Sequence, residues 1–208
     1  ICVIGDKIID IISKGLEVTK IETAPAFRFF YLFNIKLKQD LSYNRKSVLI
    51  SLPILRHESD KIFQDVYKIC NEFPNTRFYL MPHPTNIVYS KKYILKKNII
   101  FVENDVSKYL IKSNIILSSM SSICIEAISL KKPLILLNNL KTIDVSIINK
   151  DIDKRLYKRY TNYKGLKKIL RYLIQNKLSK EVEIIAENYF KGYFEEIDEI
   201  KSQKFLLN

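Results

Sequence analysis

The sequence of 208 residues predicts an α/β fold in which helices cover both faces of a parallel sheet. Two observations support this prediction. Short apolar runs suited to buried strands begin near residues 47, 77, 99, 114 and 134. Segments with helical spacing separate most of these runs, and strands that alternate with helices are typical of a Rossmann-like, doubly wound parallel sheet. Beyond the last strand, the pattern predicts carboxyl-terminal helices.

The first part of the chain predicts a few short elements of the same kind. Residues 1–4 are apolar and predict a strand, a short helical pattern follows, and residues 18–23 predict a second strand. We interpret residues 1–35 as the remnant of a preceding α/β domain. Residues 36–45 are polar and charged without periodicity, so we interpret them as a linker.

The middle of the chain carries the alternation that defines the fold. Ile62, Val66 and Ile69 recur with helical spacing along one stripe, and Pro74 ends that helix. Beyond residue 138 the sequence is irregular and polar as far as residue 163. The predicted elements are a strand at 46–52, a helix at 58–73, a strand at 77–81, a helix at 88–96, a strand at 99–102, a helix at 106–112, strands at 114–117 and 134–137, and helices at 166–174, 180–191 and 193–205, with a break at Gly192.

Four serines lie in the loop between two of these strands. Ser118, Ser119, Ser121 and Ser122 follow one strand, and a short helix leads from them to the next. Such a βαβ unit places its loop at the carboxyl edge of the sheet, where ligands bind. Small residues and hydroxyls at the start of a helix let an anion approach unpaired N–H groups, so this loop is a candidate phosphate site. The alternative is that the serines only cap the helix.

A carboxylate lies one turn into the same helix. Glu126 is four residues after Ser122, so the two side chains share one helix face, which we expect at the protein surface. The carboxylate could accept hydrogen bonds from ribose hydroxyls while the serines hold phosphate. The alternative is that Glu126 is a solvated charge.

The motif Met81-Pro82-His83-Pro84 ends another strand at the same predicted edge. The two prolines stiffen the turn and fix the direction of the histidine. A histidine placed there can donate to a phosphate oxygen or protonate a leaving phosphate. The alternative is that His83 hydrogen-bonds a loop carbonyl. His57 has a weaker claim, because helix capping or solvent exposure explains its position better.

The composition favours anionic partners and argues against a metal centre or a membrane span. The net charge of +13 favours nucleic acid, an anionic membrane face or phosphorylated substrates, although a lysine-rich composition alone explains much of it. Two histidines and three scattered cysteines form neither metal-ligand spacing nor a disulfide framework, so we expect no metal and a reducing cytoplasm. No run of about 18 apolar residues and no intact secretory signal is visible.

Together these motifs resemble the carboxyl-terminal half of a GT-B glycosyltransferase over about residues 35–205. The strand at 46–52, the Met81-Pro82-His83-Pro84 motif, the serine loop and Lys132-Pro133 occur in the order typical of that family. More closely, the chain is similar to bacterial surface-polysaccharide transferases with an HP and a Ser-Ser motif. These include bacterial sialyltransferases and the capsule and teichoic-acid polymerases.

The resemblance implies a role for each candidate residue. His83, Ser121 and Ser122 would hold the phosphate of the donor nucleotide, with His83 as a phosphate contact or an acid, and Glu126 would hold its ribose. In the sialyltransferase-like families the catalytic acid lies in the amino-terminal domain, so no acidic residue of this chain is assigned as the base that activates the acceptor. The rest of the donor site would consist of Pro82, Ser118 and Ser119.

The resemblance also implies a function. The chain would be the donor-binding part of a glycosyltransferase that moves a sugar from a nucleotide carrier to a bacterial surface glycan. Its substrate would be a CMP- or UDP-linked sugar, and it would need no separate cofactor. Its other partners would be a glycan acceptor and the missing amino-terminal domain. The protein would be cytoplasmic and would bind peripherally to the anionic face of the inner membrane. Residues 46–192 would form the nucleotide-sugar-binding domain and residues 193–208 a carboxyl-terminal helix.

Two other functions stay open. A nucleotide-sugar 2-epimerase shares the fold and a similar phosphate edge, but that family needs more acids and histidines around the sugar than this chain offers. A basic α/β module could instead bind nucleic acid through a basic stripe with interleaved aromatics. Tyr157–Tyr163, with Lys154 and Arg155 before it, is the only candidate stripe. We interpret it as a solvated loop, so nucleic acid is the least favoured partner.

Overall fold

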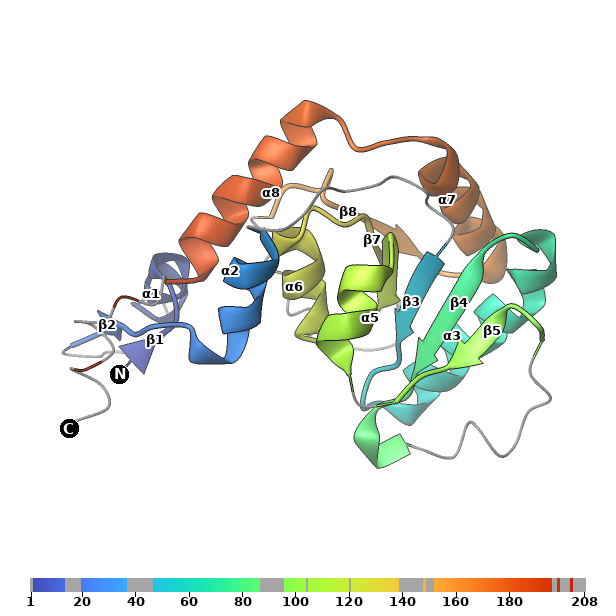
Figure 1. Cartoon of the computed structure of the whole chain (residues 1–208), viewed down its shortest axis with the longest axis horizontal. Helices are drawn as coiled ribbons and strands as arrows, with labels where there is room; N and C mark the ends of the chain where they lie inside the picture. The colour runs from blue at the N-terminus through green and yellow to red at the C-terminus, as the bar shows by residue number, and fades with distance from the viewer. Residues whose placement is uncertain are drawn as a thin grey trace.

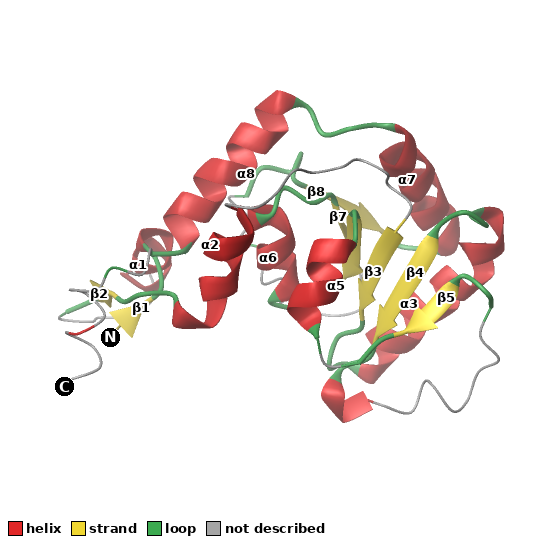
Figure 2. Ribbon diagram, in the orientation of Figure 1, coloured by secondary structure: helices red, strands yellow, loops and turns green. Residues whose placement is uncertain are grey.

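Six parallel strands form the central sheet of the computed structural model (Figures 1 and 2). The structure describes residues 2–13, 20–36, 47–86, 96–103, 105–119, 121–138, 148, 152–195, 198 and 203. The order across the sheet is β5-β4-β3-β6-β7-β8. The strands are β3 (Ser47–Ser51), β4 (Arg77–Met81), β5 (Ile99–Phe101), β6 (Ile115–Ser118), β7 (Leu134–Leu137) and β8 (Tyr157–Tyr160).

The strand order reverses direction once, between β3 and β6. The chain runs outward from β3 through β4 to β5, then returns to pair β6 with the other side of β3 and continues to β7 and β8. The register of the returning pair sets Ile50 beside Leu117. This is the order of doubly wound sheets that bind ligands at the point of reversal. The α/β, Rossmann-like fold predicted from the sequence is therefore confirmed.

Alternate residues of each strand face opposite layers of helices. In β3, Val48 and Ile50 belong to the core packed by α3 (Arg56–Ile69) and α7 (Tyr163–Gln175). Leu49 faces the other core, packed by α5 (Val106–Lys112), α6 (Ile123–Ser129) and α8 (Lys180–Tyr193). Because both faces are covered, β3 is buried along its whole length, which explains the unbroken apolar run between its two terminal serines. Two short 3₁₀ turns follow α3 and β4, at Cys70–Glu72 and Pro84–Asn86.

A second, smaller unit lies beside the sheet. Its strands β1 (Cys2–Val3) and β2 (Glu22–Thr23) pair in parallel with each other and not with the six-stranded sheet. The helix α1 (Asp6–Ser13) joins them, and a 3₁₀ turn (Phe27–Phe29) leads into α2 (Phe30–Lys36). The predicted strand–helix–strand order of this region is confirmed, although both strands are short.

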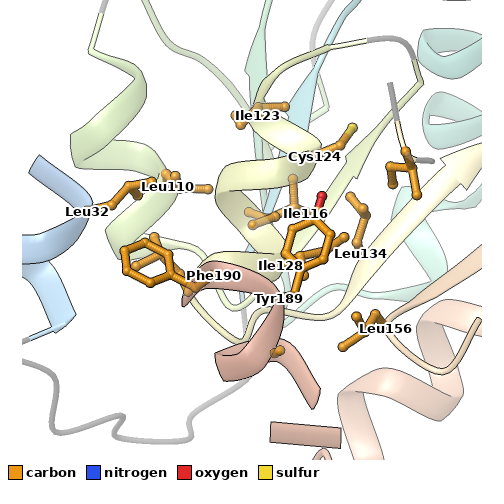
Figure 3. Close-up of a cluster of buried hydrophobic side chains, with 14 of the residues drawn as sticks. Leu32, Leu110, Ile116, Ile123, Cys124, Ile128, Leu134, Leu156, Tyr189 and Phe190 are labelled. Carbon is orange, nitrogen blue, oxygen red and sulfur yellow. The ribbon is translucent and has the colours of Figure 1, made fainter. Parts of the chain in front are cut away.

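Helix α8 connects the two units. It extends toward the β1–β2 pair (Figure 1). Just past the end of the helix, two backbone hydrogen bonds join the chain to the smaller unit. The N–H of Glu195 donates to the carbonyl of Ile4 at 2.7 Å, and the N–H of Ala26 donates to the carbonyl of Glu195 at 3.3 Å. Figure 3 shows Tyr189 and Phe190 of α8 within one buried cluster whose labelled members also come from α2, α5, α6 and the sheet.

Several boundaries differ from the sequence predictions. Residues 139–163 were expected to be irregular, yet Tyr157–Tyr160 forms β8, because pairing with β7 supplies hydrogen bonds that local sequence cannot reveal. The break expected at Gly192 lies one residue further on, since α8 ends at Tyr193 and Phe194 is extended. The predicted helix at 88–96 and the predicted linker fall almost entirely outside the described residues, and the domain boundaries at 35, 45 and 192 stay predictions. In the described part of the chain, no helix is long and apolar enough to cross a membrane.

Substituting Gly5 is expected to loosen the smaller unit from α8. A Cβ at this position would lie 2.3 Å from the backbone oxygen of Tyr193, so Gly5→Ala should cost about 1–3 kcal/mol of folding free energy. Gly165→Ala is the matched control, because its Cβ would meet nothing closer than 3.7 Å and alanine favours the helix interior. Thermal unfolding of both variants should show a lower midpoint for the first and an equal or higher midpoint for the second. A midpoint for Gly5→Ala equal to that of the parent would contradict the close approach.

Candidate functional site

The carboxyl ends of three adjacent strands meet where the strand order reverses. Ser51, the last residue of β3, lies between Met81 of β4 and Ser118 of β6. The N–H of Leu52 donates to the carbonyl of Met81 at 2.9 Å, and the hydroxyl of Ser118 donates to the carbonyl of Ser51 at 2.7 Å. The loops that follow these strands therefore start at one edge of the sheet. They carry the predicted histidine and serine motifs.

His83 is half-buried, two residues past the end of β4, and its ring is oriented by Thr85. The backbone N–H of Thr85 lies 3.3 Å from Nδ1, and the threonine hydroxyl lies 2.8 Å from it. A backbone N–H can only donate, so Nδ1 is the acceptor and the neutral ring carries its proton on Nε2. Among the described residues nothing accepts that proton. Within the described residues His83 thus presents a free N–H donor and bonds no loop carbonyl.

The four serines differ in what their hydroxyls do. Ser118 is fully buried and its hydroxyl joins β6 to β3. The hydroxyl of Ser119 donates to the Oε2 of Glu58 at 2.6 Å. Ser121 is half-buried, and its hydroxyl makes no hydrogen bond within the described residues. Ser122 precedes α6, but its side chain makes no capping hydrogen bond, so helix capping does not explain it. Pro82 is half-buried at the same edge.

Glu58 is a buried carboxylate that the sequence analysis missed. It lies in the first turn of α3 with only 3% of its surface exposed, below the serine loop. Its position is four residues before Ile62 on the apolar stripe of that helix. An acid on an apolar stripe was a signal available from the sequence, since charged residues are seldom buried without a partner. Its partner is the hydroxyl of Ser119.

Glu126 is buried, with 5% of its surface exposed, so the expectation of a surface-exposed, solvated charge is wrong. The hydroxyl of Tyr31, from α2, donates to its Oε2. Burial raises the pKa of Glu126 to about 7, and the nearby positive charge of Arg28 acts in the opposite direction. The surface expectation failed because helix periodicity places Glu126 relative to α6 alone, whereas α2 covers it from elsewhere in the chain.

The remaining reactive side chains of the described region have structural roles. Cys124 is fully buried, which raises the pKa of its thiol to about 12, so it is no nucleophile. Lys132 is buried before β7, at the opposite edge of the sheet, and donates to the carbonyls of Ile111 and Ser113. Within the part of the chain that the structure describes, no group of three His, Cys, Asp or Glu side chains could hold a metal ion.

The candidate nucleic-acid stripe is an edge strand, so its interpretation as a solvated loop is wrong. Tyr160 of β8 is buried, with 3% of its surface exposed. Arg155 forms ion pairs with Asp153 at 2.7 Å and with Glu181 at 2.6 Å, which offset its charge. One aromatic of the stretch is therefore buried and one of its cations is already paired, and the expectation that nucleic acid is the least favoured partner stays a prediction.

The fold of this chain is similar to those of several solved structures. No protein-family model matches the sequence, and no curated protein matches it. The structure is similar to the wall teichoic acid polymerase TagF, with a TM-score of 0.54 and 21% identity over 84% of this chain. It is similar to UDP-GlcNAc 2-epimerase from Neisseria meningitidis bound to UDP-GlcNAc, with a TM-score of 0.55 and 18% identity over 94% of this chain. A third similar structure is the carboxyl-terminal domain of a group 1 glycosyl transferase, LpcC, from Francisella tularensis, with a TM-score of 0.51 and 15% identity over 80% of this chain.

These similarities show the fold. The chain spans 43% of the TagF chain and 56% of the Neisseria epimerase chain, but 91% of the LpcC carboxyl-terminal domain. It therefore has the fold of the carboxyl-terminal domain of GT-B glycosyltransferases, which the 2-epimerases share.

Replacing Glu126 with Gln is expected to remove a pH dependence of stability. The folded-state pKa of about 7 lies above the usual value near 4.3, so the folded state holds this proton more tightly than the unfolded chain does. The resulting stabilisation is complete below the unfolded pKa and is lost as the pH rises through 7, by about 3 kcal/mol in all. Chemical denaturation at about pH 5 and about pH 8 should show the parent losing stability relative to the variant, whose amide does not titrate. Parallel pH profiles for the two proteins would mean that Glu126 ionises as an exposed acid does.

Proposed function

We propose that this chain is the donor-nucleotide-binding part of a glycosyltransferase that moves a sugar from a nucleotide carrier to a bacterial surface glycan. One observation carries the proposal. The reversal of strand order between β3 and β6 brings the loops of His83 and of the serines to one edge of the sheet, where ligands of doubly wound sheets bind.

The free donors at this edge suit a phosphate. His83 offers its Nε2–H and Ser121 its unpaired hydroxyl, and Ser122 lies beside it in the same loop. Hydrogen bonds to a charged phosphate oxygen are about twice as strong as those between neutral groups. Ser118 and Ser119 would support the loop from below, through Ser51 and Glu58, and would not touch the ligand with their hydroxyls.

Glu126 suits the ribose of the same nucleotide. Tyr31 occupies its Oε2, whereas no hydrogen bond within the described residues reaches its Oε1. A carboxylate oxygen that has no hydrogen-bond donor of its own can accept a hydrogen bond from a ribose hydroxyl. Ser122 and Glu126, four residues apart on α6, would then contact adjacent parts of one ligand.

The similar structures support a nucleotide-linked donor. The TagF structure was soaked with CDPG, and the Neisseria epimerase is bound to UDP-GlcNAc. A CMP- or UDP-linked sugar is therefore the proposed substrate. The proposal also includes a glycan acceptor and an opposing amino-terminal domain. It places the protein peripherally at the cytoplasmic face of the inner membrane.

A nucleotide-sugar 2-epimerase is the second candidate, because the Neisseria 2-epimerase has the same fold at a similar TM-score. Two histidines in the whole chain argue against it. Incubation with UDP-GlcNAc and separation of the sugar products distinguishes the two: an epimerase would form the 2-epimer without an acceptor, whereas a transferase half would bind the nucleotide and transfer no sugar alone.

Replacing His83 with Ala is expected to weaken nucleotide binding but not nucleoside binding. Loss of a hydrogen bond to a charged group costs about 1.5–3 kcal/mol, or roughly 10- to 150-fold in affinity for UDP or CMP. Uridine and cytidine have no phosphate, so their affinities should be unchanged. Calorimetric titration of the variant with all four ligands measures the difference.

The only other histidine supplies a matched control. His57 lies exposed in the first turn of α3, so His57→Ala should bind every ligand as the parent does. Equal affinities of parent and His83→Ala for UDP and for CMP would remove His83 from the site. Failure of the parent to bind any nucleotide would overturn the proposed function itself.

A further inference from the structure

Arg28 reaches the serine loop from outside the six-stranded sheet. It belongs to the 3₁₀ turn that precedes α2, and its Nη2 donates to the hydroxyl of Ser122 at 3.3 Å across 94 residues of sequence. The guanidinium has five N–H donors in a planar fork, and this contact uses one of them. Among the described residues, most of its hydrogen-bonding capacity therefore remains available beside the loop.

Buried neighbours hold Arg28 in place. Ala26 on one side is fully buried, and Phe29 on the other packs against Phe194 with ring centroids 4.6 Å apart. The guanidinium carbon of Arg28 lies 5.6 Å from the centroid of the Phe29 ring. One turn further along, Tyr31 donates to Glu126. The side chain is exposed, but the backbone that carries it is fixed against the helix that follows the serine loop.

The charge of Arg28 is not offset by an ion pair in the part of the chain that the structure describes. None of its nitrogens lies in an ion pair with an acid there. Its charge acts on Glu126, whose pKa burial raises to about 7, but no ion pair joins the two side chains. Arg155, by contrast, has both Asp153 and Glu181 as partners. A guanidinium without an ion pair, beside the hydroxyls of Ser121 and Ser122, is suited to an anion.

We propose that Arg28 binds the phosphate of the donor nucleotide together with Ser121 and Ser122. The donor site would then be built from two segments, the serine loop of the large sheet and the turn before α2. The inference deepens the proposed function and rests on it. It assigns Arg28 as a ligand-binding residue and Tyr31 as a positioning residue, which holds the segment against Glu126.

Calorimetric titration of Arg28 variants with UDP, CMP, uridine and cytidine tests the assignment. Arg28→Ala should weaken UDP and CMP by about 10- to 100-fold and leave both nucleosides unchanged, because only the phosphate loses a partner. Arg28→Lys keeps the charge without the planar fork, so its affinity for UDP should fall between the parent and Arg28→Ala. Arg77→Ala is the matched control, since Arg77 is exposed at the amino end of β4, at the opposite edge of the sheet.

The outcomes separate the inference from the proposed function. If the parent binds UDP and Arg28→Ala binds it equally well, Arg28 is no phosphate ligand and the proposed function stands. If Arg28→Ala loses uridine and UDP to the same extent, the residue only supports the fold of the site, and the assignment is overturned. If the parent binds neither UDP nor CMP, both proposals fall together. Circular dichroism should show that all three variants fold, because both arginine side chains are exposed.

Discussion

The pairing of β6 with β3 is the constraint on which the candidate site depends. The chain moves outward from β3 through β4 to β5 and then returns to the open side of β3, where β6 pairs. At this return the hydroxyl of Ser118 bonds the carbonyl of Ser51, at the last residues of both strands. Because β4 and β6 pair with opposite sides of β3, the loop of His83 and the loop of the serines both start at this edge of the sheet.

The sequence predicted the parts of the fold that local pattern determines. Buried strands such as β3 and β7 are short continuous apolar runs, and α3 shows its stripe, so periodicity was sufficient to locate them. The strand β8 was missed because it is an edge strand in which Lys158 and Arg159 stand together between two tyrosines. Its pairing with β7 decides its structure, and no window of sequence contains both strands. The end of α8 at Tyr193, by contrast, lies close to the break expected at Gly192, because a glycine is a local signal.

The site was predictable where its residues share a loop and hidden where they do not. Ser121, Ser122 and Glu126 follow one strand, so a βαβ argument places them together. Arg28 and Tyr31 contact the same residues from 94 and 95 positions away, which no motif spacing can show. The burial of Glu126 has the same origin, since α2 rather than α6 excludes water from it. Glu58 was the exception, because an acidic residue on the apolar stripe of α3 could be recognised from the sequence.

The backbone hydrogen bonds of Glu195 help to fix the position of the segment that carries Arg28. Its N–H donates to the carbonyl of Ile4, and its carbonyl accepts from the N–H of Ala26. One residue just beyond α8 therefore joins the helix both to the end of β1 and to the turn before α2. Phe190 and Phe194 continue the attachment, through ring contacts with Phe33 and Phe29. Helix α8 packs against α6 and therefore joins the smaller unit to the helices that cover the sheet. The position of Arg28 relative to Ser122 thus depends on how α8 is seated on α6 as well as on the turn before α2.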